Sequence, residues 1–326
     1  MGLHELAGQT SVIAPVLAKE FRSLDVVFQE HHPFHYDENK AVVLDPQSPW
    51  QRVVFILRQI LSHDFFIFEG SPFTFHLYEV PLLRLLHRKF VIRFHGCDVR
   101  YREGGLARGL TVCQTCDQVC ETWKPRRTAR LVQAAAACIV TTPDLVDFVP
   151  GSVFIPQAVS IPADWGIRHT GQSVQRRYRI VHAPSIRSRK GTDVVLSTLN
   201  HLKERFPIDV VLLENVPNST VLRELDCADL VVDQLRVGWY GVLACEAMAR
   251  GVPVVATLRQ EWVAEYQPRC PIVSADDVCL EQVIESLLAD PLRMQQLSAE
   301  SRAFAETVHS PEAVTAKVLD VCRRAV

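Results

Sequence analysis

Short runs of apolar residues alternate with longer amphipathic stretches through most of this chain. An uninterrupted apolar run is typical of a strand buried on both faces, and an amphipathic stretch is typical of a helix that covers a sheet. Repeated alternation of the two predicts parallel sheets flanked by helices, which is the α/β class. The alternation falls into two series, so we expect two doubly wound domains.

The first series contains four candidate strands and four candidate helices. We predict the strands over 25–28, 65–68, 90–94 and 138–141, and the helices over 12–20, 52–61, 80–86 and 128–137. The second series contains five candidate strands and three candidate helices. We predict these strands over 179–182, 209–213, 230–232, 252–256 and 271–273, and the helices over 192–205, 242–250 and 280–289.

Between the two series, residues 156–177 contain prolines and glycines and show little periodicity, which is typical of an interdomain connection. We therefore predict an N-terminal domain over 1–158, a linker over 159–177, a C-terminal domain over 178–308 and a C-terminal helix over 309–326. We expect that helix to cross back to the N-terminal domain.

Bulk properties limit the class of protein. A chain of 326 residues is long enough for two domains that each bury a core. Hydrophobic residues at 48% and charged residues at 22% are typical of globular proteins, and 35 basic against 37 acidic residues argue against bulk nucleic-acid binding. No apolar run approaches the roughly 20 residues that span a bilayer, and the first residues do not resemble a secretory signal. We therefore expect a cytoplasmic protein.

The chain contains ten cysteines, and three of them form a cluster. Cys113, Cys116 and Cys120 have a spacing that suits a structural zinc site or a loop staple, with Cys97 or a histidine as a fourth ligand. Free thiols or a disulfide are the alternatives. The remaining cysteines that lie in apolar patterns need no role beyond packing, namely Cys138, Cys227, Cys245 and Cys322.

The segment from Gly238 to Ala256 predicts a tight turn, a helix and a buried strand. Gly238 and Gly241 permit a sharp bend and a close approach to a ligand, and the following helix would turn its free N–H groups toward an anion. Glu246 lies on an otherwise apolar helix, where burial is costly unless polar partners are present. Ribose hydroxyls would be such partners.

This segment resembles the donor-binding signature of GT-B glycosyltransferases of family 4, E-G-F-G-x4-E-A-M-A-x-G-x-P-V-V. The second Glu of the signature, which holds the nucleotide ribose in the family, falls on Glu246. The first Glu is replaced by Gly238, and the Gly-Phe pair by Trp239 and Tyr240, so the sugar-facing carboxylate is missing. The resemblance implies donor-binding roles for the turn and the helix start, namely Gly238, Trp239, Tyr240, Gly241, Val242 and Glu246.

The resemblance also implies the fold and the type of reaction. It implies two Rossmann-like doubly wound domains facing a cleft, with the acceptor side N-terminal and the nucleotide-sugar donor side C-terminal. It further implies transfer of a sugar with retention of anomeric configuration and no metal in catalysis. The resemblance covers the second half of the chain well and the first half more loosely.

A basic loop follows the predicted strand 179–182 and resembles the family's G-R-x4-K-G loop. Lys190 falls on its phosphate-binding lysine, but Ser185 occupies the arginine position. Arg187 or Arg189 could substitute, because the strand-loop-helix order directs cations and N–H groups toward a diphosphate. A solvated basic loop is the alternative.

Two further strand ends carry candidates. Asn215 and Val216 lie where the family cradles the nucleotide base through backbone groups, although a simple turn explains them equally well. Asp233 closes the strand 230–232, where it could contact the sugar in place of the missing carboxylate. The alternative for Asp233 is a capping role in its loop.

In the first half, His95 follows the strand 90–94 and precedes a glycine. Family members with a similar Phe-His stretch use the histidine beside the donor sugar and the acceptor hydroxyl. We therefore take His95 and Asp98 as catalytic candidates, although Asp98 and Arg100 could instead pair with each other. Glu69, at the end of the strand 65–68, could line the acceptor side on position alone.

The sequence thus favours a glycosyltransferase that uses a UDP- or GDP-sugar and an unidentified saccharide, lipid or other acceptor. A catalytically impaired nucleotide-sugar-binding protein and a GT-B epimerase or phosphorylase are the alternatives. The basic stretch 124–130 could contact an anionic membrane surface or a phosphate-bearing acceptor, although it could equally be a solvated helix start.

Overall fold

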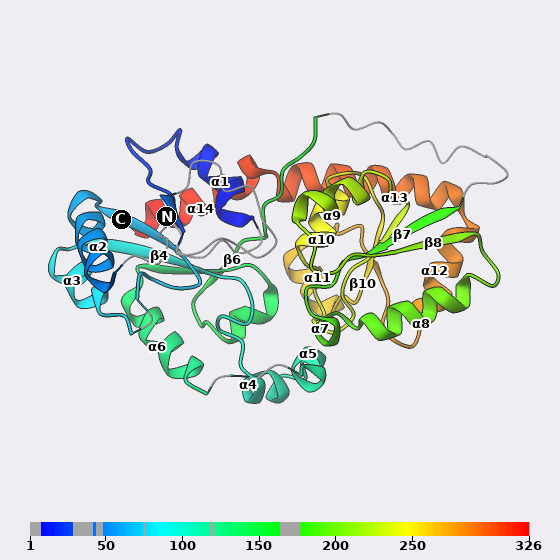
Figure 1. Ribbon diagram of the computed structural model, residues 1–326, viewed down its shortest axis with the longest axis horizontal. Coiled ribbons are helices and arrows are strands. Elements are labelled where there is room, and N and C mark those ends of the chain that lie inside the picture. Colours follow the sequence, from blue (N-terminus) through cyan, green and yellow to red (C-terminus); the bar gives the residue numbers. More distant parts are fainter. Residues whose placement is uncertain are drawn as a thin grey trace. The chain divides into compact units, whose positions relative to one another are not determined.

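The computed structural model describes residues 8–28, 42–43, 48–74, 76–117, 120, 122–163 and 177–325 (Figure 1). The chain divides into two compact units. Unit 1 comprises Met1–Tyr101, Cys120–Ala158 and Pro311–Val326, and unit 2 comprises Arg102–Val119 and Val159–Ser310. Most of the predicted linker, at 164–176, lies outside the described residues.

In the described part of unit 1, four parallel strands form a sheet in the order β3-β4-β5-β6. A separate parallel pair, β1 and β2, precedes them in sequence. The strands are β1 (Val27–Phe28), β2 (Val42–Val43), β3 (Phe65–Glu69), β4 (Lys89–Phe94), β5 (Ala137–Val140) and β6 (Val153–Phe154). The helices are α1 (Gln9–Leu17), α2 (Pro49–Ser62), α3 (Glu79–Leu85), α6 (Lys124–Ala134) and α14 (Pro311–Ala325).

Residues from both ends of the sequence build the core of unit 1. Helix α14 lies beside α1 and also contacts β4 and β5 (Figure 1). Its Val314 and Val318 are fully buried in one apolar cluster with Ile13 of α1 and Val91 of β4. Unit 1 therefore has a core that depends on the last helix of the chain.

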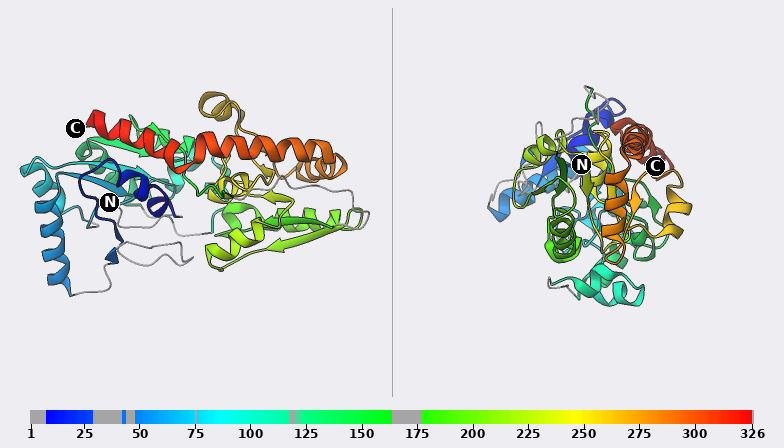
Figure 2. Two further views of the ribbon diagram at one scale, coloured as in Figure 1. Left: turned by 90° about the horizontal axis from the view of Figure 1, so that it is seen from above. Right: turned by 90° about the vertical axis from the view of Figure 1, so that its right-hand side faces the viewer.

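In the described part of unit 2, five parallel strands form a sheet in the order β11-β10-β9-β7-β8. The longer pair, β7 and β8, runs side by side (Figure 2). The strands are β7 (Tyr178–His182), β8 (Ile208–Leu212), β9 (Leu230–Val232), β10 (Val254–Ala256) and β11 (Val273–Ser274). The helices are α4 (Arg102–Ala107), α5 (Thr111–Thr115), α7 (Arg187–Lys190), α8 (Thr192–Leu202), α9 (Asn218–Leu225), α10 (Val242–Met248), α11 (Gln260–Tyr266), α12 (Leu280–Ala289) and α13 (Pro291–Phe304).

The strand order of unit 2 reverses between β7 and β9. The chain passes from β7 outward to β8 on one side, then returns to place β9 on the other side of β7. In open parallel sheets, such a reversal leaves a crevice at the carboxyl ends of the two inner strands, where ligands bind. The carboxyl ends of β7 and β9 are therefore the part of unit 2 in which to look for a site.

Local sequence explains where several elements begin and end. Ser48 caps α2, because its hydroxyl accepts from the Gln51 backbone while the Gln51 side chain accepts from the Ser48 backbone. Asp290 caps α13 in front of Pro291, which needs no hydrogen-bond partner at the first helical position. The strand 230–232 and the helix 280–289 have the predicted bounds. The bounds of most other predicted elements differ from the observed ones by a few residues.

The buried face of α14 gives a stability prediction. Val318→Ala should lower the free energy of unfolding of unit 1 by about 2 kcal/mol, because it removes buried methyl groups and leaves a cavity. Urea unfolding measures the change. Lys317→Ala, one residue earlier and exposed, is the matched control and should change stability little. Equal effects of the two substitutions would contradict the packing of α14 in unit 1.

Candidate functional site

The strand order of unit 2 reverses between β7 and β9, and we call this place the switch point. Two fully buried side chains lie there, His182 and Asp233. His182 ends β7 and is fully buried; its Nδ1 lies 2.8 Å from the Val232 carbonyl oxygen and its Nε2 lies 2.9 Å from Thr192 Oγ1. Burial lowers the pKa of His182, so the ring is neutral and donates to Val232. His182 thus fixes β7, β9 and the start of α8 relative to each other.

Asp233 follows β9 and joins the basic loop to the glycine turn. Its Oδ1 accepts from Lys190 Nζ at 2.8 Å, and its Oδ2 accepts from the Gly241 backbone N–H at 2.6 Å. The Asp233 side chain is fully buried and that of Lys190 is 14% exposed. Asp233 therefore has the capping role that was its alternative interpretation. Its predicted contact with a sugar stays a prediction.

A side chain on Gly241 would crowd this ion pair. A Cβ atom on Gly241 would lie 3.0 Å from Lys190 Nζ and 3.2 Å from Asp233 Oδ2. The glycine thus lets the backbone approach the lysine closely, as the sequence predicted for this turn. The ammonium group of Lys190 has three donors, so it can hold Asp233 and an anion together.

Glu246 lies one helical turn into α10 and is almost fully buried. Its Oε1 accepts from Asn218 Nδ2 at 2.9 Å, at the start of α9. Burial raises the pKa of the Glu246 carboxyl to about 7, against the smaller lowering effects of Asn218 and Arg250. Among the described residues, Asn218 is the side chain that hydrogen-bonds the Glu246 carboxylate, so this buried acid is poorly compensated and suited to hydroxyl donors from a ligand.

The conformation at Gly238 explains why the acid of the signature is absent there. The φ of Gly238 is +81°, a left-handed conformation that residues other than glycine rarely adopt. A Cβ atom on Gly238 would also lie 2.9 Å from Arg259 Cγ. Arg259 is held in place, because its backbone N–H donates to the Gly238 carbonyl and Nη2 donates to the Gly109 carbonyl. A glutamate could not occupy this position without rearrangement of Arg259.

The aromatic residues of the turn point into the interior of unit 2. Trp239 and Tyr240 are 1% and 2% exposed, and the Tyr240 hydroxyl lies 3.1 Å from His309 Nε2. Their side chains pack the turn, and the Trp239 carbonyl oxygen accepts from Gln234 Nε2. Val242 is half-buried at the first position of α10. Donor binding by these three residues stays a prediction.

The two candidate arginines of the basic loop have protein partners. Arg187 forms two hydrogen bonds to the Glu214 carboxylate, at 2.8 and 2.6 Å, and Glu214 follows β8. Arg189 Nε donates to Cys116 Sγ at 3.3 Å. Asn215 is exposed with a φ of +53°, and Val216 is half-buried. The loop thus contacts Glu214 after β8 and Cys116 after α5, while Arg187 is also exposed to solvent.

Unit 1 contains a buried charge cluster at the carboxyl ends of β3 and β4. Glu69 Oε1 accepts from Arg93 Nη1 at 2.8 Å, and Glu69 Oε2 lies 2.6 Å from His95 Nε2. The side chains of Glu69 and Arg93 are fully buried and that of His95 is 7% exposed. Burial alone would raise the pKa of Glu69, but Arg93 and His95 outweigh it and hold the pKa below its ordinary value.

The loop after β4 is shaped by Asp98. Its carboxylate accepts from the backbone N–H groups of His95, Gly96 and Val99 at 2.7 to 3.1 Å. The suggested pairing of Asp98 with Arg100 is wrong, because Arg100 instead donates twice to Asp144 Oδ2, at 2.8 and 2.7 Å. Asp98 fixes the backbone at His95, and its catalytic role stays a prediction.

The cysteine cluster lies at the edge of the described residues. Cys113 is buried, and Cys116 and Cys120 are half-buried. Among the described residues, which omit 118, 119 and 121, no group of three or more His, Cys, Asp or Glu side chains could hold a metal ion. The structural zinc stays a prediction.

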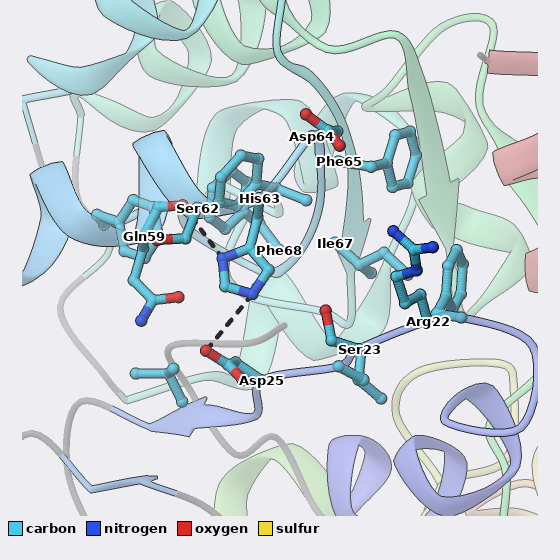
Figure 3. Close-up of a pocket in the computed structure, with 15 residues that line it drawn as sticks. Arg22, Ser23, Asp25, Gln59, Ser62, His63, Asp64, Phe65, Ile67 and Phe68 are labelled. Carbon is cyan, nitrogen blue, oxygen red and sulfur yellow. Dashed lines mark hydrogen bonds and ion pairs between the residues drawn. The ribbon is translucent and has the colours of Figure 1, made fainter.

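A cavity of about 380 Å³ opens in unit 1 beside β3 and the end of α2 (Figure 3). His63 lies in the wall of this cavity. Its Nδ1 is 3.2 Å from the Gln59 carbonyl oxygen, and its Nε2 is 3.4 Å from Asp25 Oδ2. Phenylalanine side chains make up much of the remaining lining. None of the described residues that line it is a predicted site residue.

None of the helices in the described ranges is both long and apolar enough to cross a membrane.

Comparison with known proteins relates the chain to solved structures only. No protein-family profile and no curated protein sequence matches it. A glycosyltransferase from Rickettsia africae superposes with a TM-score of 0.67 at 12% identity, covering 100% of this chain and 97% of that one. Anabaena HepE in complex with UDP gives 0.62 at 12% identity, covering 99% and 98%. Sucrose-phosphate synthase from Thermosynechococcus elongatus gives 0.61 at 14% identity, covering 98% and 91%. The chain has the GT-B fold.

The structure adds residues that the sequence did not single out. Asn218 binds Glu246, Arg93 binds Glu69, and Arg259 crowds Gly238. An arginine inside an apolar strand, as Arg93 is in β4, is a usable signal because such a cation needs a buried acid. Asn218 and Arg259 carry no comparable signal, since both lie in ordinary polar surroundings in the sequence.

The raised pKa of Glu246 predicts a pH-dependent cost to stability. Its pKa is near the ordinary value of 4.5 when unfolded and about 7 when folded, so the folded state disfavours the charged form. The contribution of Glu246 to the free energy of unfolding is therefore fully present below pH 4.5 and is lost as the pH rises through 7. Glu246→Gln should therefore gain stability over the wild type by up to about 3 kcal/mol between pH 4.5 and 8.

Urea unfolding of both proteins across this pH range measures the difference. Glu261→Gln, on the exposed side of α11, is the matched control and should show no comparable trend. A constant difference between Glu246→Gln and the wild type would contradict the buried acid.

The crowding at Gly238 predicts a second stability effect. Gly109→Ala should cost about 1 kcal/mol, because Gly109 has a φ of +64° but no atom nearer than 3.9 Å to the new Cβ. Gly238→Ala has the same conformational cost and adds the contact with Arg259, for about 1 kcal/mol or more beyond it. Thermal or urea unfolding compares the two. If Gly238→Ala cost no more than Gly109→Ala, Arg259 would not be what excludes a side chain.

Proposed function

We propose that this protein is a glycosyltransferase that moves a hexose from a nucleotide-sugar donor to a saccharide, lipid or other small-molecule acceptor. We propose further that transfer retains the anomeric configuration, needs no metal, and follows the family 4 type. The observation that carries the proposal is the Lys190–Asp233–Gly241 arrangement at the switch point of unit 2, one helix turn from Glu246.

The chemistry of glycosyl transfer explains what this arrangement would do. As the bond between sugar and diphosphate breaks, negative charge grows on the leaving diphosphate. A preorganised cation and nearby N–H groups stabilise that charge without reorganisation. Lys190 is held by a buried carboxylate, so its ammonium is already placed before a donor binds. It would thus perform the role that a metal ion performs in other transferases.

Glu246 supplies the second anchor. A carboxylate accepts hydrogen bonds from both hydroxyls of a ribose, and Asn218 holds one of its oxygens from the side. Binding such hydroxyls would return to Glu246 the solvation that burial removes. UDP is the first nucleotide to test, because Anabaena HepE, a protein with the same fold, binds UDP and UDP-glucose. GDP-sugars are the second.

One observation favours a different function, that of a nucleotide-sugar-binding protein without turnover. Gly238 replaces an acid of the family signature, and Arg259 fills the space that its side chain would need. A site that keeps its ribose and phosphate contacts but lacks the sugar-facing acid could bind a donor and not react. Only a turnover measurement separates this function from transfer.

A donor panel tests the proposed function. A nucleotide sugar at 100 times its dissociation constant should stabilise the protein by about 2.7 kcal/mol, measured as a thermal shift. Lys190→Ala should weaken the donor's affinity by about tenfold or more, since it removes a charge-assisted contact, and Glu246→Ala should abolish the shift. Lys203→Ala, an exposed lysine at the end of α8, is the matched control.

Turnover then separates the functions. Release of nucleoside diphosphate with candidate acceptors present, undiminished by EDTA, supports a metal-independent transferase. Donor binding without release in any acceptor mixture would leave the binding protein, and interconversion of the donor without acceptor would indicate an epimerase. If no nucleotide sugar shifts the melting temperature, both the transferase and the binding-protein proposals fail.

A further inference from the structure

Residues 102–117 belong to unit 2, although the chain on both sides of them belongs to unit 1, and we call them the arm. The two helices of the arm, α4 and α5, fit closely together, because a Cβ atom on Gly105 would overlap Cys113 Sγ. Leu110, between the two helices, is 1% exposed. Such a detour of the chain costs conformational entropy, so contacts within unit 2 must offset that cost.

The arm contacts the segment that leads into the Gly238 turn. The Val112 N–H donates to the Arg236 carbonyl at 2.8 Å, and the Val112 side chain is buried. Arg259, whose side chain crowds Gly238, donates from Nη2 to the Gly109 carbonyl. Two separate hydrogen bonds therefore connect the arm to the residues that shape this turn.

The arm also contacts the basic loop, because α5 lies beside α7, the short helix that ends at Lys190 (Figure 1). Ser188 Oγ donates to Asp117 Oδ1 at 2.7 Å. Arg189 Nε donates to Cys116 Sγ at 3.3 Å. The arm thus holds the two residues that come immediately before the lysine.

Helix α7 is too short to fix the position of Lys190 by itself. It comprises only Arg187–Lys190, and a single helical turn is unstable in water because its nucleation is costly. The Lys190 carbonyl accepts from the Leu235 N–H at 3.1 Å, which holds the end of the turn. The bonds from the arm to Ser188 and Arg189 hold the middle of it.

We infer that the arm is a positioning element of the donor site. It holds the basic loop and the Gly238 turn at the places where Lys190 Nζ meets the Asp233 carboxylate. Asp117 is a positioning residue that acts through Ser188, and Lys190 is the residue that would touch a diphosphate. The effect on a donor rests on the proposed function, whereas the bracing of the loop does not.

The charge of Asp117 makes this inference testable by the sign of an effect. An acid near a phosphate site repels the phosphate, so if Asp117 acted by charge alone, its removal would strengthen donor binding. If Asp117 holds Ser188, its removal instead loosens the loop that carries Lys190 and weakens donor binding. Asp117→Asn keeps an acceptor oxygen for the Ser188 hydroxyl and should bind a donor at least as well as the wild type.

Hydrogen exchange of the ligand-free protein tests the bracing without a donor. The amides of Lys190 and Gly191 are bonded to carbonyls one turn earlier, so their exchange reports the opening of α7. Asp117→Ala should speed their exchange about threefold or more, and Asp117→Asn should not. Unchanged exchange in Asp117→Ala would overturn the inference.

Asp193→Ala is the matched control for both measurements. Asp193 lies at the start of α8, its side chain is 91% exposed, and its contact with Arg187 is long, at 3.8 Å. A surface pair of this kind contributes little, so the substitution should leave the exchange of α7 unchanged. It removes an acid near the basic loop without removing a bond from the arm, and thus reports the effect of charge alone.

The affinity for UDP-glucose, measured by calorimetry, tests the effect on the donor. Asp117→Ala should bind UDP-glucose about three- to tenfold more weakly than the wild type, and Asp193→Ala no more weakly. Ser188→Ala should match Asp117→Ala, and the double variant should be no weaker than either single variant, because all three lack the same hydrogen bond.

Unchanged or stronger binding by Asp117→Ala, or additive losses in the double variant, would overturn the role of the arm in donor binding. Absence of any UDP-glucose binding by the wild type would count against the proposed function and that role together. The exchange measurement would still decide whether the arm braces the loop.

Discussion

The geometry of unit 2 depends on the two hydrogen bonds that the Asp233 carboxylate accepts. It joins the end of β9 to Lys190 in the basic loop and to the backbone of Gly241 before α10. Because the carboxylate is fully buried, it needs a cation and donors to offset its desolvation, and the two contacts supply both. The basic loop, the end of β9 and the backbone before α10 therefore meet at one point. The Gly238 turn and the start of α10 take their positions from this point.

Unit 1 uses a related arrangement with a different outcome. There the buried acid is Glu69 at the end of β3, and it binds Arg93 and His95 from the neighbouring strand β4. In unit 2 the acid positions a permanent cation, which suits a charged phosphate group. In unit 1 the guanidinium of Arg93 pairs with the acid, whose other oxygen contacts the His95 ring. The two sheets thus present different chemistry from equivalent positions, the carboxyl ends of parallel strands.

The sequence predicted the α/β class and most strands because parallel strands are apolar on both faces and leave a periodic signal. It also assigned diphosphate binding to Lys190 and the N–H groups near Gly241, since the basic loop and the turn both precede helices. The structure brings these two residues side by side, and their binding of phosphate stays a prediction. The sequence could not predict that both carboxylate oxygens of Asp233 would accept hydrogen bonds from the protein itself, or that the Trp239 side chain would be buried. Those outcomes depend on which atoms from distant segments meet, and no spacing within one segment encodes that. The same reason hid Asn218 and Arg259.

The return of α14 to unit 1 has a consequence for biosynthesis. Unit 2 uses residues up to Ser310, whereas the core of unit 1 includes Val314 and Val318 of the last helix. During vectorial synthesis on the ribosome, unit 2 thus has its full set of residues before unit 1 does. Synthesis of unit 1 begins first, but the apolar faces of its α1, β4 and β5 stay uncovered until α14 has emerged from the ribosome. For that interval the N-terminal half is the part of the nascent chain that most needs chaperone protection.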